Sequence, residues 1–210
     1  MINFVLSKLL RDRFCDVIFL FPELCIHGGI KFKKIKCHKI LLSVFSDYFK
    51  SLFNFDSEKI IIINGYSYEV FKMMIDYIYD NNLKIDFNDS NFLLESLQLS
   101  DEYMLTKYKI VILDKIKEEI KLKKEMLPLN NYIDYLISLI NKSSDLLLYE
   151  CMDLVIKNLD NIIKNSKNSE NIIMKIVLNK NILNYKNIKN MMYENDNNEE
   201  EDFGLSKLIL

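Results

Sequence analysis

The chain has 210 residues, half of them hydrophobic and 28% charged, which is the composition of a folded protein with a substantial core. Its formal net charge of −2 gives no general attraction to nucleic acid or to anionic membranes, so neither is an expected partner. Because the chain has only four Gly and two Pro, long coil regions and a turn-rich all-β fold are both disfavoured.

The N-terminal residues 3–11 have apolar side chains at helical spacing and predict a short amphipathic helix. Its apolar face consists of Val5, Leu6, Leu9 and Leu10. A helix this short is marginal alone in water, so this face must be buried, either on another chain or on its own subunit. The segment from Met1 to Arg13 carries its positive charges after the apolar run, so we expect no secretory signal.

A β-hairpin is expected next. The β-branched and aromatic residues at 16–21 indicate a buried strand that Pro22 ends, and Gly28-Gly29 marks a turn. The imperfect alternation at 31–37 predicts the second strand of the hairpin. We interpret the lysines at 31, 33, 34 and 36 as the solvated edge of the hairpin, where they would block unwanted strand pairing.

The period then changes to helical. One helical face is predicted to consist of Ile40, Leu41, Val44 and Phe45. Ser46 is expected to cap the helix that follows, and Ser67 to cap a third helix. Between them, the run of isoleucines at 60–63 predicts a short central strand.

The predicted order ends with a possible short strand at 83–85, a helix from Asp89 or Ser90 to about Leu99, and a helix from near Tyr103 to Lys123. Strands and helices that do not alternate regularly are typical of the α+β class. Residues 128–192 contain no Gly and keep helical spacing, which predicts a smaller all-helical unit. Residues 193–210 form an acidic tail with an apolar end.

Five segments, in this order, resemble the successive signatures of the BTB/POZ domain family over about residues 1–120. They are Asp16-Val17, Cys37 to Leu42, Ser46 to Phe53, the isoleucine strand at 60–63, and Phe71 to Tyr79. The resemblance implies an α+β BTB/POZ domain at 1–123. The helical region at 128–192 is similar to the BACK-type extension that often follows such domains, and the tail covers 193–210.

The resemblance also implies a role in protein–protein interaction without catalysis or cofactors. In the family, residues corresponding to Asp16 and Lys39 lie near a homodimer interface, together with the N-terminal helix that carries Val5, Leu6, Leu9 and Leu10. The alternative for Asp16 is that it only caps or flanks a strand. Where members of the family bind a cullin, the region around Tyr48, Phe55 and Asp56 supplies the contact, whereas Phe49 and Phe53 are expected to point inward.

Two functions follow from the resemblance. The first is an adaptor that homodimerises and brings a substrate to a cullin-type ubiquitin ligase. The second is a structural protein that uses the same fold for self-assembly. No Gly-rich phosphate loop, G-x-S-x-G or H-E-x-x-H motif is present in the sequence, so we expect no enzyme activity.

The cysteines and histidines have no standard zinc-site spacing. In an extended chain the adjacent Cys37 and His38 point to opposite faces, so a site shared with Cys25 and His27 is not expected. We expect a cytoplasmic protein with reduced thiols. The frequent Ile, Asn and Lys indicate an AT-rich coding sequence, as in some protists, parasites and giant viruses, and a viral protein would reside in the host cytoplasm or the virion.

Overall fold

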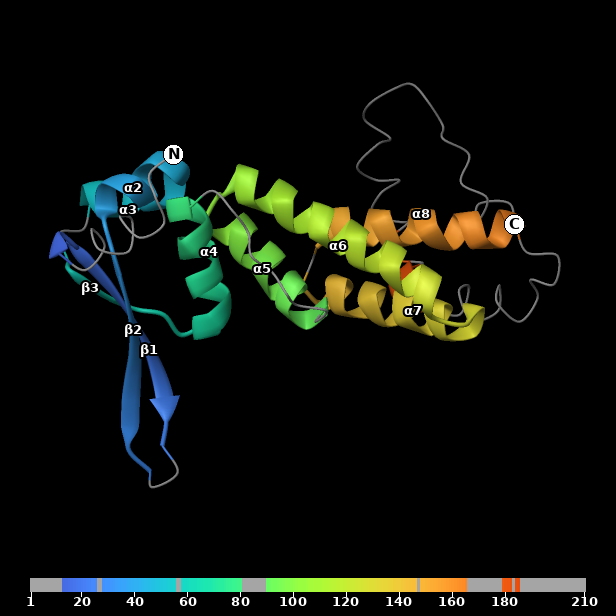
Figure 1. Cartoon of the computed structure of the whole chain (residues 1–210), viewed down its shortest axis with the longest axis horizontal. Helices are drawn as coiled ribbons and strands as arrows, with labels where there is room; N and C mark the ends of the chain where they lie inside the picture. Colours follow the sequence, from blue (N-terminus) through green and yellow to red (C-terminus); the bar gives the residue numbers. More distant parts are fainter. Residues whose placement is uncertain are drawn as a thin grey trace. The chain divides into compact units, whose positions relative to one another are not determined.

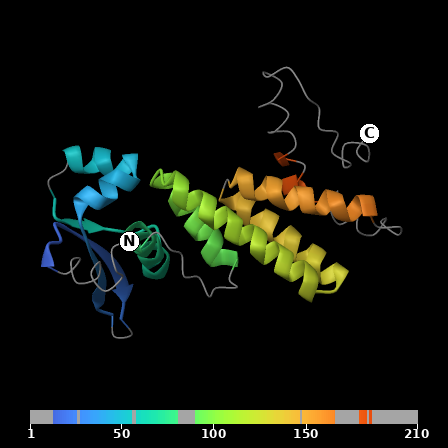
Figure 2. The same ribbon diagram turned by 45° about the horizontal axis from the view of Figure 1, so that its top comes forward.

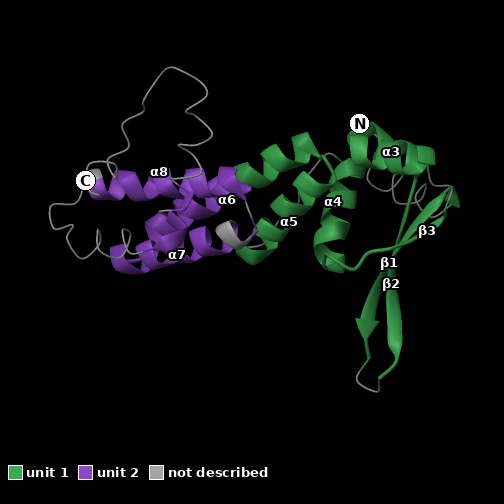
Figure 3. Cartoon of the chain, turned by 180° about the vertical axis from the view of Figure 1, so that it is seen from behind, with its two compact units in different colours: residues 1–114 green, residues 115–210 purple. Residues whose placement is uncertain are grey.

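The computed structural model describes residues 13–25, 28–55, 58–80, 90–146, 148–165, 179–182 and 184–185. The chain divides into two compact units, Met1–Asp114 and Lys115–Leu210, coloured separately in Figure 3. The domain boundaries predicted from the sequence stay predictions. The predicted helix at 3–11, the strand at 83–85 and the tail at 193–210 lie outside the described residues.

The first unit contains a mixed sheet, three-stranded over the described residues, in the order β2-β1-β3. Strands β1 (Val17–Leu24) and β2 (Ile30–Cys37) form the predicted antiparallel hairpin. Strand β3 (Ile60–Ile62) pairs in parallel with β1, from Ile18↔Ile60 to Leu20↔Ile62. The far end of the hairpin extends beyond the helices of the same unit (Figure 1). There Gly28 has a φ of 79°, a conformation that favours glycine over residues with a Cβ.

Two predictions about the sheet are wrong. Strand β1 continues through Pro22, which pairs with Phe32 of β2. The Ile18 N–H donates to the Lys59 carbonyl on the β3 side of the strand. Every second residue of a strand has its N–H on the same side, so the N–H that Pro22 lacks would also face β3. Because β3 pairs with β1 no further than Leu20, no sheet hydrogen bond is lost there. Within the described part of the chain the isoleucine strand is also not central, because β1 occupies the middle of the sheet and β3 one edge.

Helix α4 (Tyr68–Asp80) packs its aromatic residues against one face of the sheet, called here the inner face. Phe19 and Phe21 of β1 are buried on this face, and the ring centroid of Phe71 lies 4.9 Å from that of Phe19 and 5.3 Å from that of Phe21. Phe49 of α3 (Asp47–Phe55) lies 5.9 Å from Phe19 on the same side. Aromatic rings therefore make up much of the core of the first unit.

The predicted caps of two helices are confirmed. The Ser46 hydroxyl accepts the Phe49 N–H at 3.1 Å at the start of α3, and the Ser67 hydroxyl accepts the Val70 N–H at 3.4 Å at the start of α4. Helix α5 (Ser90–Glu102) ends in a turn where Met104 has a φ of 52°, so α6 (Thr106–Met126) begins three residues later than predicted.

The second unit contains the rest of α6 together with α7 (Leu129–Asp145) and α8 (Tyr149–Asn165). Helices α7 and α8 lie side by side (Figure 2). Their buried residues keep the predicted helical spacing: Tyr132, Ile133, Leu136 and Ile140 on α7, and Met152, Val155, Ile156 and Leu159 on α8. None of the helices that the structure describes is both long and apolar enough to cross a membrane.

Candidate interaction surface

Helix α2 (Lys39–Phe45) begins where two of the predicted interface residues meet. The Lys39 N–H donates to the Asp16 Oδ1 at 2.7 Å, whereas the side chain of the N-cap residue His38 makes no capping bond. Asp16 thus satisfies a free N–H of the first helical turn and places a negative charge at the positive end of the helix. The Lys39 ammonium lies 5.1 Å from the ring centroid of Phe53. The structure therefore brings Asp16 and Lys39 together, while their part in a dimer stays a prediction.

His38 has a structural position at the junction of β2 and α2. Its backbone N–H donates to the Tyr79 hydroxyl at 3.0 Å, and its Nδ1 lies 2.7 Å from the same oxygen. The hydroxyl accepts from the backbone, which leaves its own proton available for Nδ1. This arrangement joins the start of α2 to the end of α4 and holds the two helices together.

The residues predicted to share one apolar face of α2 are not the ones that are buried. Leu42 is fully buried, whereas Ile40 and Val44 are 70% and 73% exposed. Asp16 and His38 fix the helix at its first turn, and Leu42 then lies on the core side. An apolar stripe has the same sequence pattern whether it faces the core or a partner, so the pattern alone does not show which side of α2 is buried. Ile40 and Val44, one turn apart, are therefore exposed apolar residues beside Asp16 and Lys39.

The residues predicted to contact a cullin lie on or after α3. Phe49 is buried as expected, and Phe55, the last residue of the helix, is 93% exposed. Tyr48 is half-buried, with its ring centroid 5.0 Å from that of Tyr103. Asp56 lies outside the described residues. Of the two predicted contact residues that the structure describes, Phe55 is thus the one with an exposed side chain.

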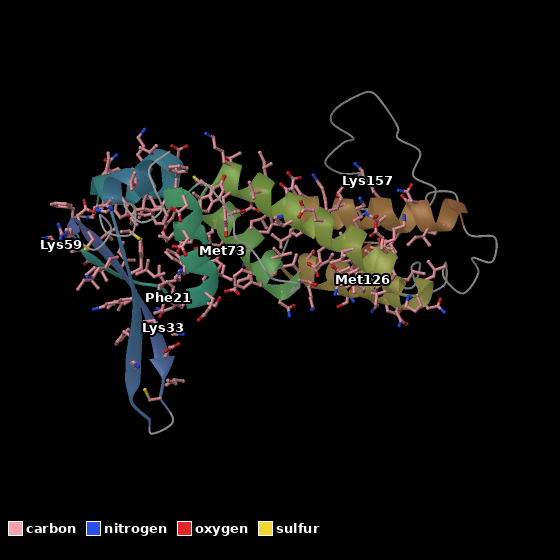
Figure 4. All side chains as sticks on the ribbon, viewed as in Figure 1. Phe21, Lys33, Lys59, Met73, Met126 and Lys157 are labelled. Carbon is pink, nitrogen blue, oxygen red and sulfur yellow. The ribbon has the colours of Figure 1, made fainter. Side chains whose placement is uncertain are left out.

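The predicted lysine edge of the hairpin is present in part, because Lys36 is half-buried and Lys33 belongs to an ion-pair cluster. Lys33 lies 2.6 Å from Glu23 and 3.1 Å from Glu69 of α4, and it is labelled in Figure 4 beside Phe21. These hydrogen bonds raise the pKa of Lys33 and lower the pKa of Glu69. Lys33 therefore links the hairpin to α4, whereas Lys31 and Lys34 are exposed.

The cysteines do not converge. Cys25 is exposed at the far end of the hairpin and Cys37 is buried at its base, so the length of β2, about 25 Å, separates them. Cys151, on α8, is also buried, and burial raises the pKa of its thiol to about 11. Within the described residues, no cluster of three or more His, Cys, Asp or Glu side chains could hold a metal ion. His27 lies outside them.

Val5, Leu6, Leu9 and Leu10 of the predicted interface lie outside the described residues as well. Sequence reasoning missed the exposure of Ile40 and Val44. It also missed the apolar residues on the second face of the sheet, although the uninterrupted apolar run of β1 was a signal for them.

Comparison with known proteins identifies relatives of the first unit. A family model described as the BTB/POZ domain matches residues 6–119. Kelch-like protein 36 of Rattus norvegicus is 30% identical over 103 residues, which cover 45% of this chain and 15% of that protein. Human Kelch-like protein 24 is 31% identical over 90 residues, covering 41% and 14% respectively. The match thus extends over about a seventh of the length of these curated relatives.

Two solved structures are also similar to the chain. The BTB domain of zebrafish PATZ1 is 22% identical with a TM-score of 0.43, and the match covers 53% of this chain and 86% of that one. The BTB domain of human gigaxonin is 22% identical with a TM-score of 0.41, and the match covers 51% and 81% respectively.

Proposed function

The chain belongs to the BTB/POZ domain family of protein-interaction modules, and from this premise we propose that it homodimerises and acts as an adaptor for a cullin-type ubiquitin ligase. The observation that carries the proposal is the uncovered apolar pair Ile40 and Val44 on α2. In the family, the residues that correspond to Asp16 and Lys39 lie near the dimer interface, together with the N-terminal helix. In this chain Asp16 holds the first turn of the helix that presents the exposed pair.

The proposed dimer surface joins α2 to the apolar face of the predicted N-terminal helix. A substantial fraction of the surface of any soluble protein is apolar, so isolated exposed aliphatic residues need no explanation. Ile40 and Val44 are not isolated, because they lie four residues apart on one helix face. A second copy that buried both side chains would remove apolar area from water worth about 25 cal/mol per Å².

Sedimentation velocity of the full chain tests the dimer. The wild type is expected to sediment as a dimer at about 50 μM, and either Ile40→Glu/Val44→Glu or Leu6→Glu should shift it towards monomer. A buried glutamate without a partner costs several kcal/mol, which exceeds the apolar gain at the site. Phe55→Ala, at an exposed residue of α3, is the control and should sediment as the wild type does. A wild-type monomer at this concentration contradicts the proposed dimer.

The proposed cullin contact rests on Phe55, whose side chain is almost fully exposed at the end of α3. An exposed aromatic residue is the kind of side chain that dominates binding energy once a partner buries it. The helical unit at 128–192 would then hold the substrate, in the place of a BACK-type extension. For this contact Tyr48 is the weaker candidate, because its ring already packs on Tyr103.

Titration of the chain with a purified cullin N-terminal fragment tests the contact. We expect binding at micromolar concentration, and Phe55→Ala should weaken it at least about tenfold. Ile110→Thr, a change at an exposed residue of α6, is the control and should leave binding unchanged. A stable dimer that does not bind the fragment would favour the structural, self-assembling function instead.

A cytoplasmic location, either in a cell or in the cytoplasm of a virus-infected host, forms part of the same proposal. Its support is that none of the four cysteines, Cys15, Cys25, Cys37 and Cys151, forms a disulfide. Cysteines that are not joined in disulfides are usual in a reducing compartment.

A further inference from the structure

The outer face of the sheet, opposite the face that α4 covers, presents an apolar strip. The strand registers align its side chains in four rows. Successive rows contain Ile18 with Ile60 and Lys36, Leu20 with Ile62 and Lys34, Pro22 with Phe32, and Leu24 with Ile30. Several of these side chains are well exposed: Ile60 is 51%, Ile62 55%, Ile30 63% and Leu24 88% accessible.

The sequence of β1 is typical of a strand covered on both sides. A strand with one solvated face usually alternates apolar and polar residues, whereas a strand buried on both faces is apolar at nearly every position. In β1, Val17, Phe19 and Phe21 cover the inner face, and the residues between them are also apolar. The two faces thus have similar chemistry but different burial, which indicates that a further element covers the outer one.

The positive charge on the outer face indicates which kind of molecule can bind there. The ten positions of the four rows, all within the described part of the chain, contain two ionic residues, Lys34 and Lys36 of β2. A second copy stacked on this face would bring like charges together, which disfavours self-association. A partner with an apolar stripe bordered by carboxylates would instead gain both apolar contact and ion pairs with these lysines.

We infer that the outer face of the sheet is a second docking surface, distinct from the proposed dimer and cullin contacts. Its occupant is an amphipathic helix of a partner protein, and this helix carries Asp or Glu along the flank of its apolar stripe. A helix packed on the face of a sheet is one of the common layer arrangements of proteins. The strip runs along the eight residues of β1, about 26 Å, which matches a helix of about 17 residues. Two lysines are fewer than the basic clusters of four to eight residues that bind anionic lipid, so a protein is favoured over a membrane.

Fluorescence anisotropy with two matched probes tests the inference on the full chain. Both probes are labelled helical peptides of about 18 residues with the same leucine stripe, one with glutamates and the other with lysines along the flank. We expect the glutamate probe to bind at micromolar concentration and the lysine probe to bind at least about tenfold more weakly. The affinity of the glutamate probe should fall as the salt concentration rises.

Variants at exposed positions then locate the binding. The double variant Ile60→Thr/Ile62→Thr loses apolar area but keeps β-branched side chains. It should lower the affinity for the glutamate probe about tenfold or more. Ile110→Thr is the matched control, because Ile110 is 56% exposed on α6 and should not affect the probe. Lys34→Glu should lower the ratio of the two probe affinities about tenfold. Circular dichroism melting establishes that each variant is folded.

Several results would overturn the inference. They are no binding of the glutamate probe up to about 100 μM, equal binding of both probes, or equal binding by the Ile60→Thr/Ile62→Thr variant. A further one is binding of the chain to phosphatidylserine-containing vesicles that the same double variant abolishes, because it would assign the strip to a membrane.

Discussion

The two faces of the sheet in the first unit are built from the same strands and yet differ in burial. On the inner face Val17 and Phe19 are fully buried, whereas on the outer face Ile18 and Leu20, their neighbours in the chain, remain partly accessible. Hydrophobicity alone therefore does not determine which face of a strand is covered. The difference shows that α4 and α3 stabilise one face from within the chain, and that the other face is available to a partner.

The largest expected effect comes from truncating an inner-face side chain. Phe19→Ala should lower the free energy of unfolding by about 3–5 kcal/mol, because the cavity also removes ring contacts with Phe49 and Phe71. Leu20→Ala, one residue along on the outer face, should lower it by about 1 kcal/mol or less. Urea unfolding followed by circular dichroism measures both changes. Equal losses would show that the two faces do not differ.

A smaller effect is expected at Ser46, which fixes the start of α3, one of the helices that cover the inner face. The Ser46 hydroxyl caps α3 and also donates to the Tyr103 carbonyl at 2.6 Å, and Ser46 is buried. Ser46→Ala should therefore lower the free energy of unfolding by about 1–2 kcal/mol. Ser51→Ala, at an exposed serine of the same helix, is the control and should have little effect. A neutral Ser46→Ala in thermal or urea unfolding would mean that packing of Phe49 alone holds α3 in place.

The smallest effect is expected on the outer face itself. Ile60→Thr should change the free energy of unfolding by no more than about 0.5 kcal/mol, since the side chain is half exposed and threonine suits a strand. Differential scanning calorimetry of the purified chain measures this change. A loss of about 2 kcal/mol or more would indicate that the outer face is already covered within the chain, and would remove the basis for a partner there.

Much of the fold could be predicted from local chemistry. Ser46 and Ser67 were identified as caps because a hydroxyl placed before an apolar helical stripe satisfies free N–H groups. The hairpin followed from the Gly28-Gly29 turn between two β-rich runs, and the family followed from ordered signatures such as Cys37-His38-Lys39. These features depend on residues close together in the chain, and for that reason the sequence alone predicts them.

The features that were missed depend on residues far apart in the chain. Whether Ile40 faces the core depends on Asp16 and Tyr79, which fix α2 from 24 and 39 residues away in the chain. Pro22 is tolerated because β3 ends before reaching it, and the position of β3 at the sheet edge depends on its pairing with β1. Apolar patterns predict which residues avoid water, but only the assembled sheet shows which of them still lack cover.

The distribution of cysteines has a practical consequence. Cys37 and Cys151 are shielded, and the raised pKa of Cys151 keeps its sulfur protonated at neutral pH, whereas Cys25 is open to reagents at the far end of the hairpin. A maleimide fluorophore or a nitroxide spin label should therefore react with Cys25 before the buried thiols. Because Cys25 directly follows Leu24, a label attached to it would report on the outer strip, and no engineered cysteine is needed.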